Sequence, residues 1–279
     1  MQTVFLPYSK SDKKAKASEN DNLPRLVHGM RPLLQRIRAI ISAYTRLIEP
    51  THLRGLKIPC SLCEFPFLVV LARGEMGIRC PRCRASVVHM SMAHVLKTHC
   101  DSLSKFAVYE LSSRGPFVTY LRRSCMNLKV SEFWPDLSPG QWRNGIQCQN
   151  VERLTYADES FDLCTSTEVF EHVVDDLIGF REIRRVLRSG GVFIFSVPLR
   201  LDERTLERAA LIDGEICYLE EPEYHDDLLR GAGKVLAYRT YGYDITDKLL
   251  EAGFSKAIID TSATEYFNGL GRPLIVATV

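Results

Sequence analysis

The chain has 279 residues, with 46% hydrophobic and 25% charged side chains and a formal net charge of +2. These values are typical of a globular protein, and the small net charge argues against a chain that clamps nucleic acid with its whole surface. The sequence contains no run of ~18 apolar residues and no charged-then-apolar leader, so we expect a cytoplasmic protein without a membrane partner.

The N-terminal part of the chain divides into two segments. Residues 1–22 include the polar, lysine-rich stretch SDKKAKASEND, which has little to bury and is expected to be a disordered arm. In residues 23–55, apolar side chains recur at helical spacing with arginines between them, which predicts an amphipathic helix. This helix could dock on the rest of the chain, or it could pair with a second copy and form a homodimer.

The cysteines point to a metal site and not to disulfides, because there are nine of them in a chain without a leader. Four form two CxxC pairs, Cys60 with Cys63 and Cys80 with Cys83, separated by sixteen residues. Two such pairs can present four thiolates to one tetrahedral zinc ion, and a closed shell of this kind makes the zinc structural. Residues 56–103 are therefore predicted to be a zinc-ribbon-like module, with the spacer as a short β-hairpin. Reduced cysteines without metal, or a redox pair, are the alternatives.

From about residue 90 the pattern changes to alternating helices and strands. The predicted strands are residues 106–111, 127–133, 160–169, 191–199, 256–263 and 274–279. The predicted helices are residues 90–99, 116–123, 177–189 and 245–254, the third closed by two glycines. Strands separated by helices of this length predict an α/β fold with a mainly parallel sheet and right-handed crossovers.

Several segments in this part of the chain follow the order of motifs of a known family. The stretch FAVYELSSRG places Glu110 at the end of a strand and before a short turn. The stretch QNVERLTYADESFDLCTSTEVFEHV contains the order L-x-aromatic-x-D-x-S-F-D followed by E-H-V, and REIRRVLRSGGVFIFSVP comes after it. This order resembles the class I S-adenosylmethionine-dependent methyltransferases. The resemblance implies a Rossmann-like doubly wound sheet over residues 104–279, mostly parallel with an antiparallel last strand.

By this resemblance, the cofactor S-adenosylmethionine is bound at the carboxyl ends of the first two strands. Glu110 is the acid that ends the first strand. The turn after it would contact the cofactor through Ser112, Ser113 and Gly115. Serines then stand where the family has glycines, and they keep the loop small while adding hydroxyl groups. After the second strand, Glu132 or its neighbour Ser131 would accept hydrogen bonds from the ribose hydroxyls.

The resemblance also assigns cofactor contacts further along the chain. Asn150 would hydrogen-bond the adenine amino group, with the backbone of Val151 beside it. Thr167 and Glu168 fall at the carboxyl end of the strand that begins at Phe161, and they would face the cofactor.

Candidate catalytic residues lie in two places. His172 is the candidate base, because an imidazole titrates near pH ~6.5, and Glu171 beside it could orient it or cap the following helix. An insertion at about residues 199–240 contains the sequence EEPEYHDD, in which Tyr224 and His225 offer further acid–base groups. A divalent metal held by His225 and the two aspartates after it is conceivable, although these residues do not make a full ligand set.

These expectations lead to one predicted function and two alternatives. The predicted function is methyl transfer to a small molecule or glycan, as an O-methylation in a biosynthetic pathway. The first alternative is an RNA methyltransferase that binds RNA with the zinc module, since residues 10–57 are rich in Lys and Arg. Against it, basic and aromatic residues are not interleaved and no N-P-P-Y-like tetrad occurs, so a nucleic-acid partner is not expected. The second alternative is a non-catalytic cofactor-binding or assembly subunit.

Overall fold

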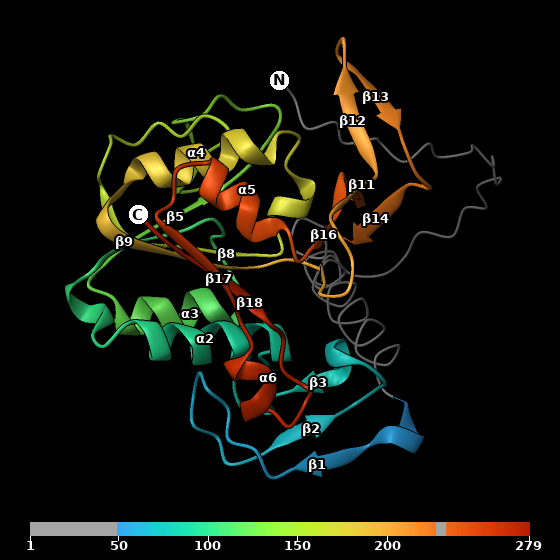
Figure 1. The fold of residues 1–279 in the computed structure, drawn as a ribbon. Helices are drawn as coiled ribbons and strands as arrows, with labels where there is room; N and C mark the ends of the chain where they lie inside the picture. Colours follow the sequence, from blue (N-terminus) through green and yellow to red (C-terminus); the bar gives the residue numbers. More distant parts are fainter. Residues whose placement is uncertain (1–48, 227–232) are drawn as a thin grey trace, which may run out of the picture.

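The computed structural model of the chain describes residues 49–226 and 233–279 (Figure 1). The predicted arm and nearly all of the predicted N-terminal helix lie outside the described residues. The predicted homodimer through that helix therefore concerns residues that the structure does not describe. Within these residues, no helix combines the length and the apolar character needed to cross a membrane.

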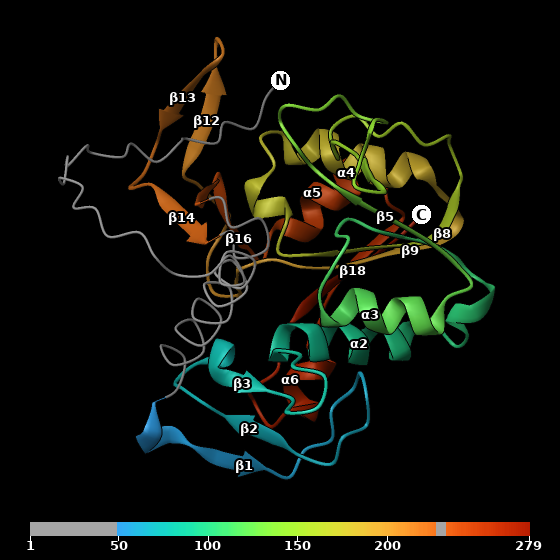
Figure 2. The same cartoon turned by 180° about the vertical axis from the view of Figure 1, so that it is seen from behind.

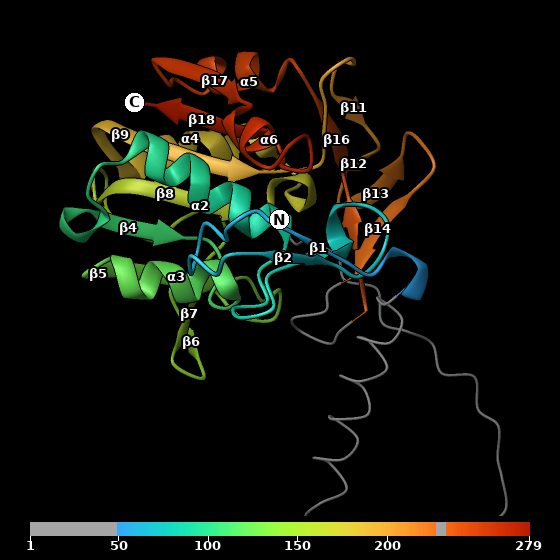
Figure 3. The ribbon, with the colours of Figure 1, turned by 90° about the horizontal axis from the view of Figure 1, so that it is seen from below.

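A sheet of eight strands forms the centre of the molecule. In spatial order the strands are β17 (Lys256–Asp260), β18 (Leu274–Thr278), β9 (Leu187–Ser196), β8 (Phe161–Thr167), β4 (Ala107–Glu110), β5 (Asn127–Glu132), β7 (Ile146–Cys148) and β6 (Trp142–Arg143). Strands β4, β5, β7, β8 and β9 are parallel, whereas β18 is antiparallel to both of its neighbours. The predicted Rossmann-like fold is confirmed. Its strand order reverses between β4 and β8, where such sheets bind ligands (Figure 3).

Helices cover both faces of the sheet, and alternate residues of the central strands point to opposite faces. Val108 and Ile194 belong to one buried cluster, whereas their neighbours Tyr109 and Phe193 belong to the other. Figure 1 shows the helices of the first face below the sheet and those of the second face above it. The first face carries α2 (Val87–His99), α3 (Pro116–Ser124) and α6 (Ser262–Tyr266), and the second carries α4 (Asp176–Val186) and α5 (Ile245–Glu251).

Two predicted boundaries differ clearly from the structure. The strand expected over residues 256–263 ends at Asp260, because α6 begins at Ser262. The helix expected over residues 177–189 ends at Val186, and β9 begins at the next residue, before the two glycines. Gly190 has a φ of +74°, and a Cβ on Gly191 would lie 2.8 Å from the carbonyl oxygen of Arg188. The glycine pair therefore makes a tight turn at the start of the strand and does not close the helix.

The segment with the cysteine pairs forms a small antiparallel sheet below α2 (Figure 2). It contains β1 (Arg54–Leu56), β2 (Leu68–Val70) and β3 (Ile78–Arg79), together with the 3-10 turns η2 (Pro50–His52) and η3 (Glu75–Gly77). Strands β2 and β3 pair within the spacer between the two CxxC pairs. Leu68 of this sheet and Met90 of α2 belong to the same buried cluster as Val108, so the small sheet and the first face of the large sheet share one core.

The segment after β9 folds into short strands beyond the carboxyl ends of β8 and β9 (Figure 3). Strand β16 pairs with β10 and β11, and two antiparallel pairs, β12 with β13 and β14 with β15, complete the segment. The strands are β10 (Leu199–Arg200), β11 (Leu206–Glu207), β12 (Ala209–Ile212), β13 (Glu215–Tyr218), β14 (Glu223–Asp226), β15 (Lys234–Ala237) and β16 (Arg239–Gly242). The remaining short elements are the 3-10 turns η4 (Leu103–Lys105) and η5 (Phe170–His172).

Candidate functional site

The four cysteines of the CxxC pairs come together at one point. The Sγ atoms lie 3.6 Å apart for Cys60 and Cys83 and 3.5 Å apart for Cys63 and Cys80, and all four lie within 4.8 Å of one another. A tetrahedral zinc ion with Zn–S bonds of ~2.3 Å requires sulfur separations of ~3.8 Å. The four thiols therefore have the arrangement that a tetrahedral metal ion needs.

The two CxxC turns have the same backbone structure. The carbonyl oxygen of Cys60 accepts from the N–H of Glu64, and that of Cys80 accepts from the N–H of Arg84, both at 2.8 Å. Glu64 and Arg84 have φ values of +59° and +63°, a conformation that few non-glycine residues adopt. Each turn thus points its two thiols to the same side, although the residues between the cysteines differ.

At the carboxyl end of β4, the predicted cofactor turn is held by two buried acids. Ser113 donates to Glu132 Oε1 from its N–H at 3.2 Å and from its hydroxyl at 2.8 Å. Glu110 accepts from the N–H of Ser112 at 3.2 Å and from the hydroxyl of Thr165 at 2.5 Å. Burial raises the pKa of Glu110 to about 8, and the nearby Glu132 adds to this effect. The predicted side chains of this turn therefore lie together and are already ordered by hydrogen bonds within the protein.

Gly115 ends this turn and precedes the first residue of α3. Its φ of +105° and ψ of 172° are accessible to glycine but strained for residues with a side chain. A Cβ at this position would have its closest neighbour, the Nε2 atom of His89, at 3.7 Å. The requirement for glycine here thus comes from the backbone conformation and not from crowding.

Asn150 lies at the rim of a pocket of about 540 Å³ beyond the ends of β5 and β7. The pocket also contains Phe133, the residue after Glu132, and Ile178 of α4. The side-chain oxygen of Asn150 accepts from the N–H of Glu152 at 2.9 Å, and Val151 is buried in the core. Charged side chains, among them Asp136 and Arg153, line the same pocket.

At the carboxyl end of β8, Thr167 and Glu168 differ in their contacts. Among the described residues the hydroxyl of Thr167 is buried without a hydrogen-bond partner. Glu168 has a φ of +53° and accepts from Arg272 at 2.8 Å. Arg272 also pairs with Glu75 of η3 at 2.6 Å, so it links the cysteine-bearing segment to the end of β8.

The candidate catalytic residues are only partly brought together. Glu171 and His172 on η5 meet His225 of β14, with Glu171 Oε1 3.7 Å from His172 Nε2 and 3.7 Å from His225 Nδ1. Glu171 is completely buried, and burial raises its pKa well above the usual range, with Glu168 adding to the effect. Within the described part of the chain, Tyr224 makes no hydrogen bond to this group, and its hydroxyl lies 3.2 Å from that of Tyr218.

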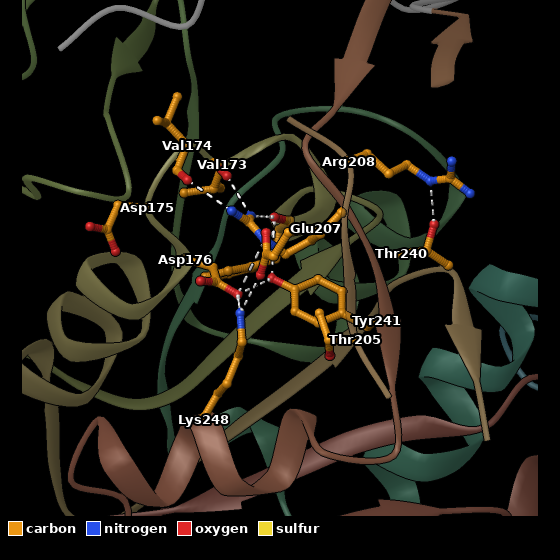
Figure 4. Close-up of polar contacts among 12 residues, drawn as sticks. Val173, Val174, Asp175, Asp176, Thr205, Glu207, Arg208, Thr240, Tyr241 and Lys248 are labelled. Carbon is orange, nitrogen blue, oxygen red and sulfur yellow. Dashed lines mark hydrogen bonds and ion pairs between the residues drawn. The ribbon is translucent and has the colours of Figure 1, made fainter. Parts of the chain in front are cut away.

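Arg239 of β16 fixes the turn that carries this group. Its guanidinium donates to the backbone oxygens of Phe170, Val173 and Val174, at 3.3, 2.5 and 2.8 Å. It also pairs with Glu207 at 2.9 Å. Figure 4 shows the carbonyl groups of Val173 and Val174 beside this network of contacts.

The network continues through Asp176, the first residue of α4. Its carboxylate lies 3.5 Å from the Arg239 Nε atom and accepts from Lys248 and from the Tyr241 hydroxyl, both at 2.9 Å (Figure 4). These cations lower the pKa of Asp176, although burial alone would raise it. Sequence reasoning missed Arg239 and Arg272, because their acidic partners are far away along the chain.

A comparison with known proteins finds a family match in the central part of the chain. Residues 112–195 match the family model described as a methyltransferase domain. These residues run from the turn after β4 to the penultimate residue of β9 and include Glu132, Asn150, Glu171 and His172, whereas His225 lies outside them.

Individual relatives are more distant or match over a short segment. A sarcosine/dimethylglycine N-methyltransferase of Halorhodospira halochloris is 46% identical over 52 residues, 19% of this chain. The match thus spans about a fifth (19%) of the length of that curated relative. An S-adenosylmethionine-dependent methyltransferase structure from Mesorhizobium loti is 20% identical, with 68% of this chain and 98% of that chain covered and a TM-score of 0.41. The 1,6-didemethyltoxoflavin-N1-methyltransferase of Burkholderia thailandensis is 15% identical, with coverages of 69% and 77% and a TM-score of 0.39.

Proposed function

We propose that this chain, which contains a class I S-adenosylmethionine-dependent methyltransferase domain, transfers a methyl group from S-adenosylmethionine to a small-molecule or glycan acceptor. The observation that carries the proposal is the pair of buried acids at the ends of β4 and β5. Glu132 holds the turn through both the N–H and the hydroxyl of Ser113, and Glu110 holds it through Ser112.

The cofactor would extend from the pocket at Asn150 to the end of β8. Phe133 and Asn150 would take the adenine, with the backbone of Val151 beside it, and Glu132 would accept from the ribose hydroxyls. The turn that contains Ser112, Ser113 and Gly115 would contact the cofactor. Thr167 and Glu168 would contact its methionine end. When bound, S-adenosylmethionine supplies a methyl group on a positively charged sulfur.

The acceptor would lie beside Glu171, His172 and His225, beyond the end of β8. His172 Nδ1 donates to the carbonyl oxygen of Leu236 at 2.8 Å, so the neutral ring carries its lone pair on Nε2. That nitrogen is the one suited to remove a proton from a hydroxyl acceptor, and Glu171 would support it. Tyr224 and His225 would line the acceptor side.

An O-methylation is the form of the reaction that gives His172 a role. The names of the Halorhodospira and Burkholderia relatives describe N-methyltransferases, which favours an amine as the second candidate acceptor. An amine that enters as the free base needs no proton removed before it attacks. An amine acceptor therefore predicts a small effect of His172→Ala, and a hydroxyl acceptor predicts a large one.

We further propose that the four cysteines hold one structural zinc ion. The sulfur separations and the two matching turns support this assignment. Four thiolates complete a tetrahedral shell, so such an ion would stabilise the small sheet and leave no position for a substrate. Metal analysis of the purified protein should give one zinc ion per chain. A folded preparation without metal at these cysteines would contradict the assignment.

Calorimetric titration with S-adenosylmethionine and S-adenosylhomocysteine tests the proposed function. The wild-type protein should bind both, and Glu132→Gln should weaken binding about tenfold to a hundredfold, because hydrogen bonds to a charged acceptor contribute ~1.5–3 kcal/mol. Glu251→Gln, an exposed acid on α5, is the matched control and should leave both affinities unchanged. A wild-type protein that binds neither compound would overturn the proposal.

A further inference from the structure

The group formed by Glu171, His172 and His225 has the geometry of a metal site, separate from the four cysteines. The three ligand atoms lie within 4.8 Å of one another, and the carboxylate oxygen is 3.7 Å from each imidazole nitrogen. These separations are too long for hydrogen bonds. A cation with bonds of ~2.1 Å places neighbouring ligand atoms ~3.0–3.4 Å apart, so each of the two carboxylate–imidazole separations is a few tenths of an ångström longer than a bound cation requires.

The hydrogen bonds of the two imidazoles direct their lone pairs toward Glu171. His172 Nδ1 donates to the carbonyl oxygen of Leu236, and His225 Nε2 donates to Glu223 Oε1 at 3.2 Å. In a neutral imidazole the other ring nitrogen carries the lone pair, and here that nitrogen is the one closest to Glu171 in both residues. Histidines that bind metals usually donate their second N–H to a carbonyl or carboxylate, as these two do.

The carboxyl group of Glu171 accepts no hydrogen bond from the described residues, although its side chain is fully buried. Two arginines lie near enough to act on it electrostatically, but other acids already bind them. These acids are Asp176 and Glu207 for Arg239, and Glu75 and Glu168 for Arg272. A buried carboxylate without a hydrogen bond is costly, and a cation at this point would remove the cost.

We propose that Glu171, His172 and His225 bind a divalent first-row transition-metal ion. Two imidazoles and one carboxylate suit such ions and leave further coordination positions open. The side chain of His225 is 31% exposed, so these positions can be reached from solvent. The metal site itself does not depend on the proposed methyl transfer. Only the use of its open coordination positions by a methyl acceptor rests on that proposal. With the ion bound, the lone pair of His172 is occupied, and the ion takes over the activation of the acceptor.

The test is a calorimetric titration, with Co²⁺ and with Mn²⁺ each added alone, of protein that metal analysis shows to carry one zinc ion per chain, held by the four cysteines. We expect one saturable site per chain, with Co²⁺ bound more tightly than Mn²⁺. Glu171→Gln and His225→Gln should each weaken Co²⁺ binding at least about a hundredfold, since each removes one of three ligands. His99→Gln is the matched control, because it removes an imidazole 2.7 Å from the carboxylate of Asp260 and should leave the titration unchanged.

The wild-type titration alone decides the proposal if a variant fails to fold. No saturable site for either ion would overturn it, and so would equal Co²⁺ affinity in the wild type and both site variants. Binding of S-adenosylhomocysteine, measured on the same preparations, separates the two proposals. If the wild-type protein binds Co²⁺ as expected but does not bind S-adenosylhomocysteine, the proposed methyl transfer is overturned, whereas the metal site is supported independently.

Discussion

Two regions at the same edge of the sheet differ in the hydrogen bonding of their buried acids. At the ends of β4 and β5, Glu110 and Glu132 accept hydrogen bonds from the turn and from β8. Beyond the end of β8, Glu171 is equally buried, but within the described chain it accepts no hydrogen bond and meets two imidazoles at 3.7 Å.

This difference separates a region in which the buried acids accept hydrogen bonds from one in which the buried acid accepts none from the described residues. The turn after β4 is ordered by the protein's own groups, so a cofactor would meet a surface that is already formed. At the other region, Glu171 and His172 of η5 meet His225 of β14, and Arg239 holds the backbone at and after η5 through the carbonyl oxygens of Phe170 and Val173. A buried carboxylate without a hydrogen bond costs stability, and a bound ion or substrate would offset this cost.

The largest expected effect comes from removing the imidazole of His172. His172→Ala should lower turnover with a hydroxyl acceptor about 10²–10⁴-fold, the usual contribution of acid–base groups, and leave cofactor affinity nearly unchanged. The rate of S-adenosylhomocysteine release and a calorimetric cofactor titration measure the two quantities. His52→Ala, which alters a histidine in the cysteine-bearing part of the chain, is the control. Unaltered turnover in His172→Ala would remove this residue from the chemistry.

A smaller effect is expected from Arg239, on stability. Arg239→Met should lower the free energy of unfolding by about 3–5 kcal/mol, because it leaves three backbone oxygens without their buried donor and removes one of the two cations beside Asp176. Arg181→Met is the matched control, since Arg181 makes an exposed pair with Glu251 at 3.9 Å, worth at most ~1 kcal/mol. Urea unfolding followed by circular dichroism measures both changes. Equal losses in the two variants would show that Arg239 does not anchor η5.

The fold and much of the cofactor region could be predicted because their signals are local. The CxxC pairs and the acid at the end of each strand stand next to the elements that position them. The antiparallel last strand followed from the resemblance. The limit of local signals appears at Gly190 and Gly191, where a helix stop and a turn within a strand look the same in sequence.

The acceptor region could be predicted only in part, because distant segments build it. His225 lies 53 residues after His172, and nothing near either residue indicates that they meet. Tyr224 is next to His225, yet on a strand neighbouring side chains point to opposite faces. Arg239 and Arg272 carry ordinary surface-type side chains, and only their burial against distant acids gives them a role.

The most direct measurement for the central claim is a crystal structure of the zinc-loaded protein with S-adenosylhomocysteine. We predict the adenine beside Phe133 and Asn150, the ribose hydroxyls on Glu132, and the sulfur near Thr167 and the group around Glu171. Binding elsewhere on the molecule, or no binding at saturating concentration, would contradict the account.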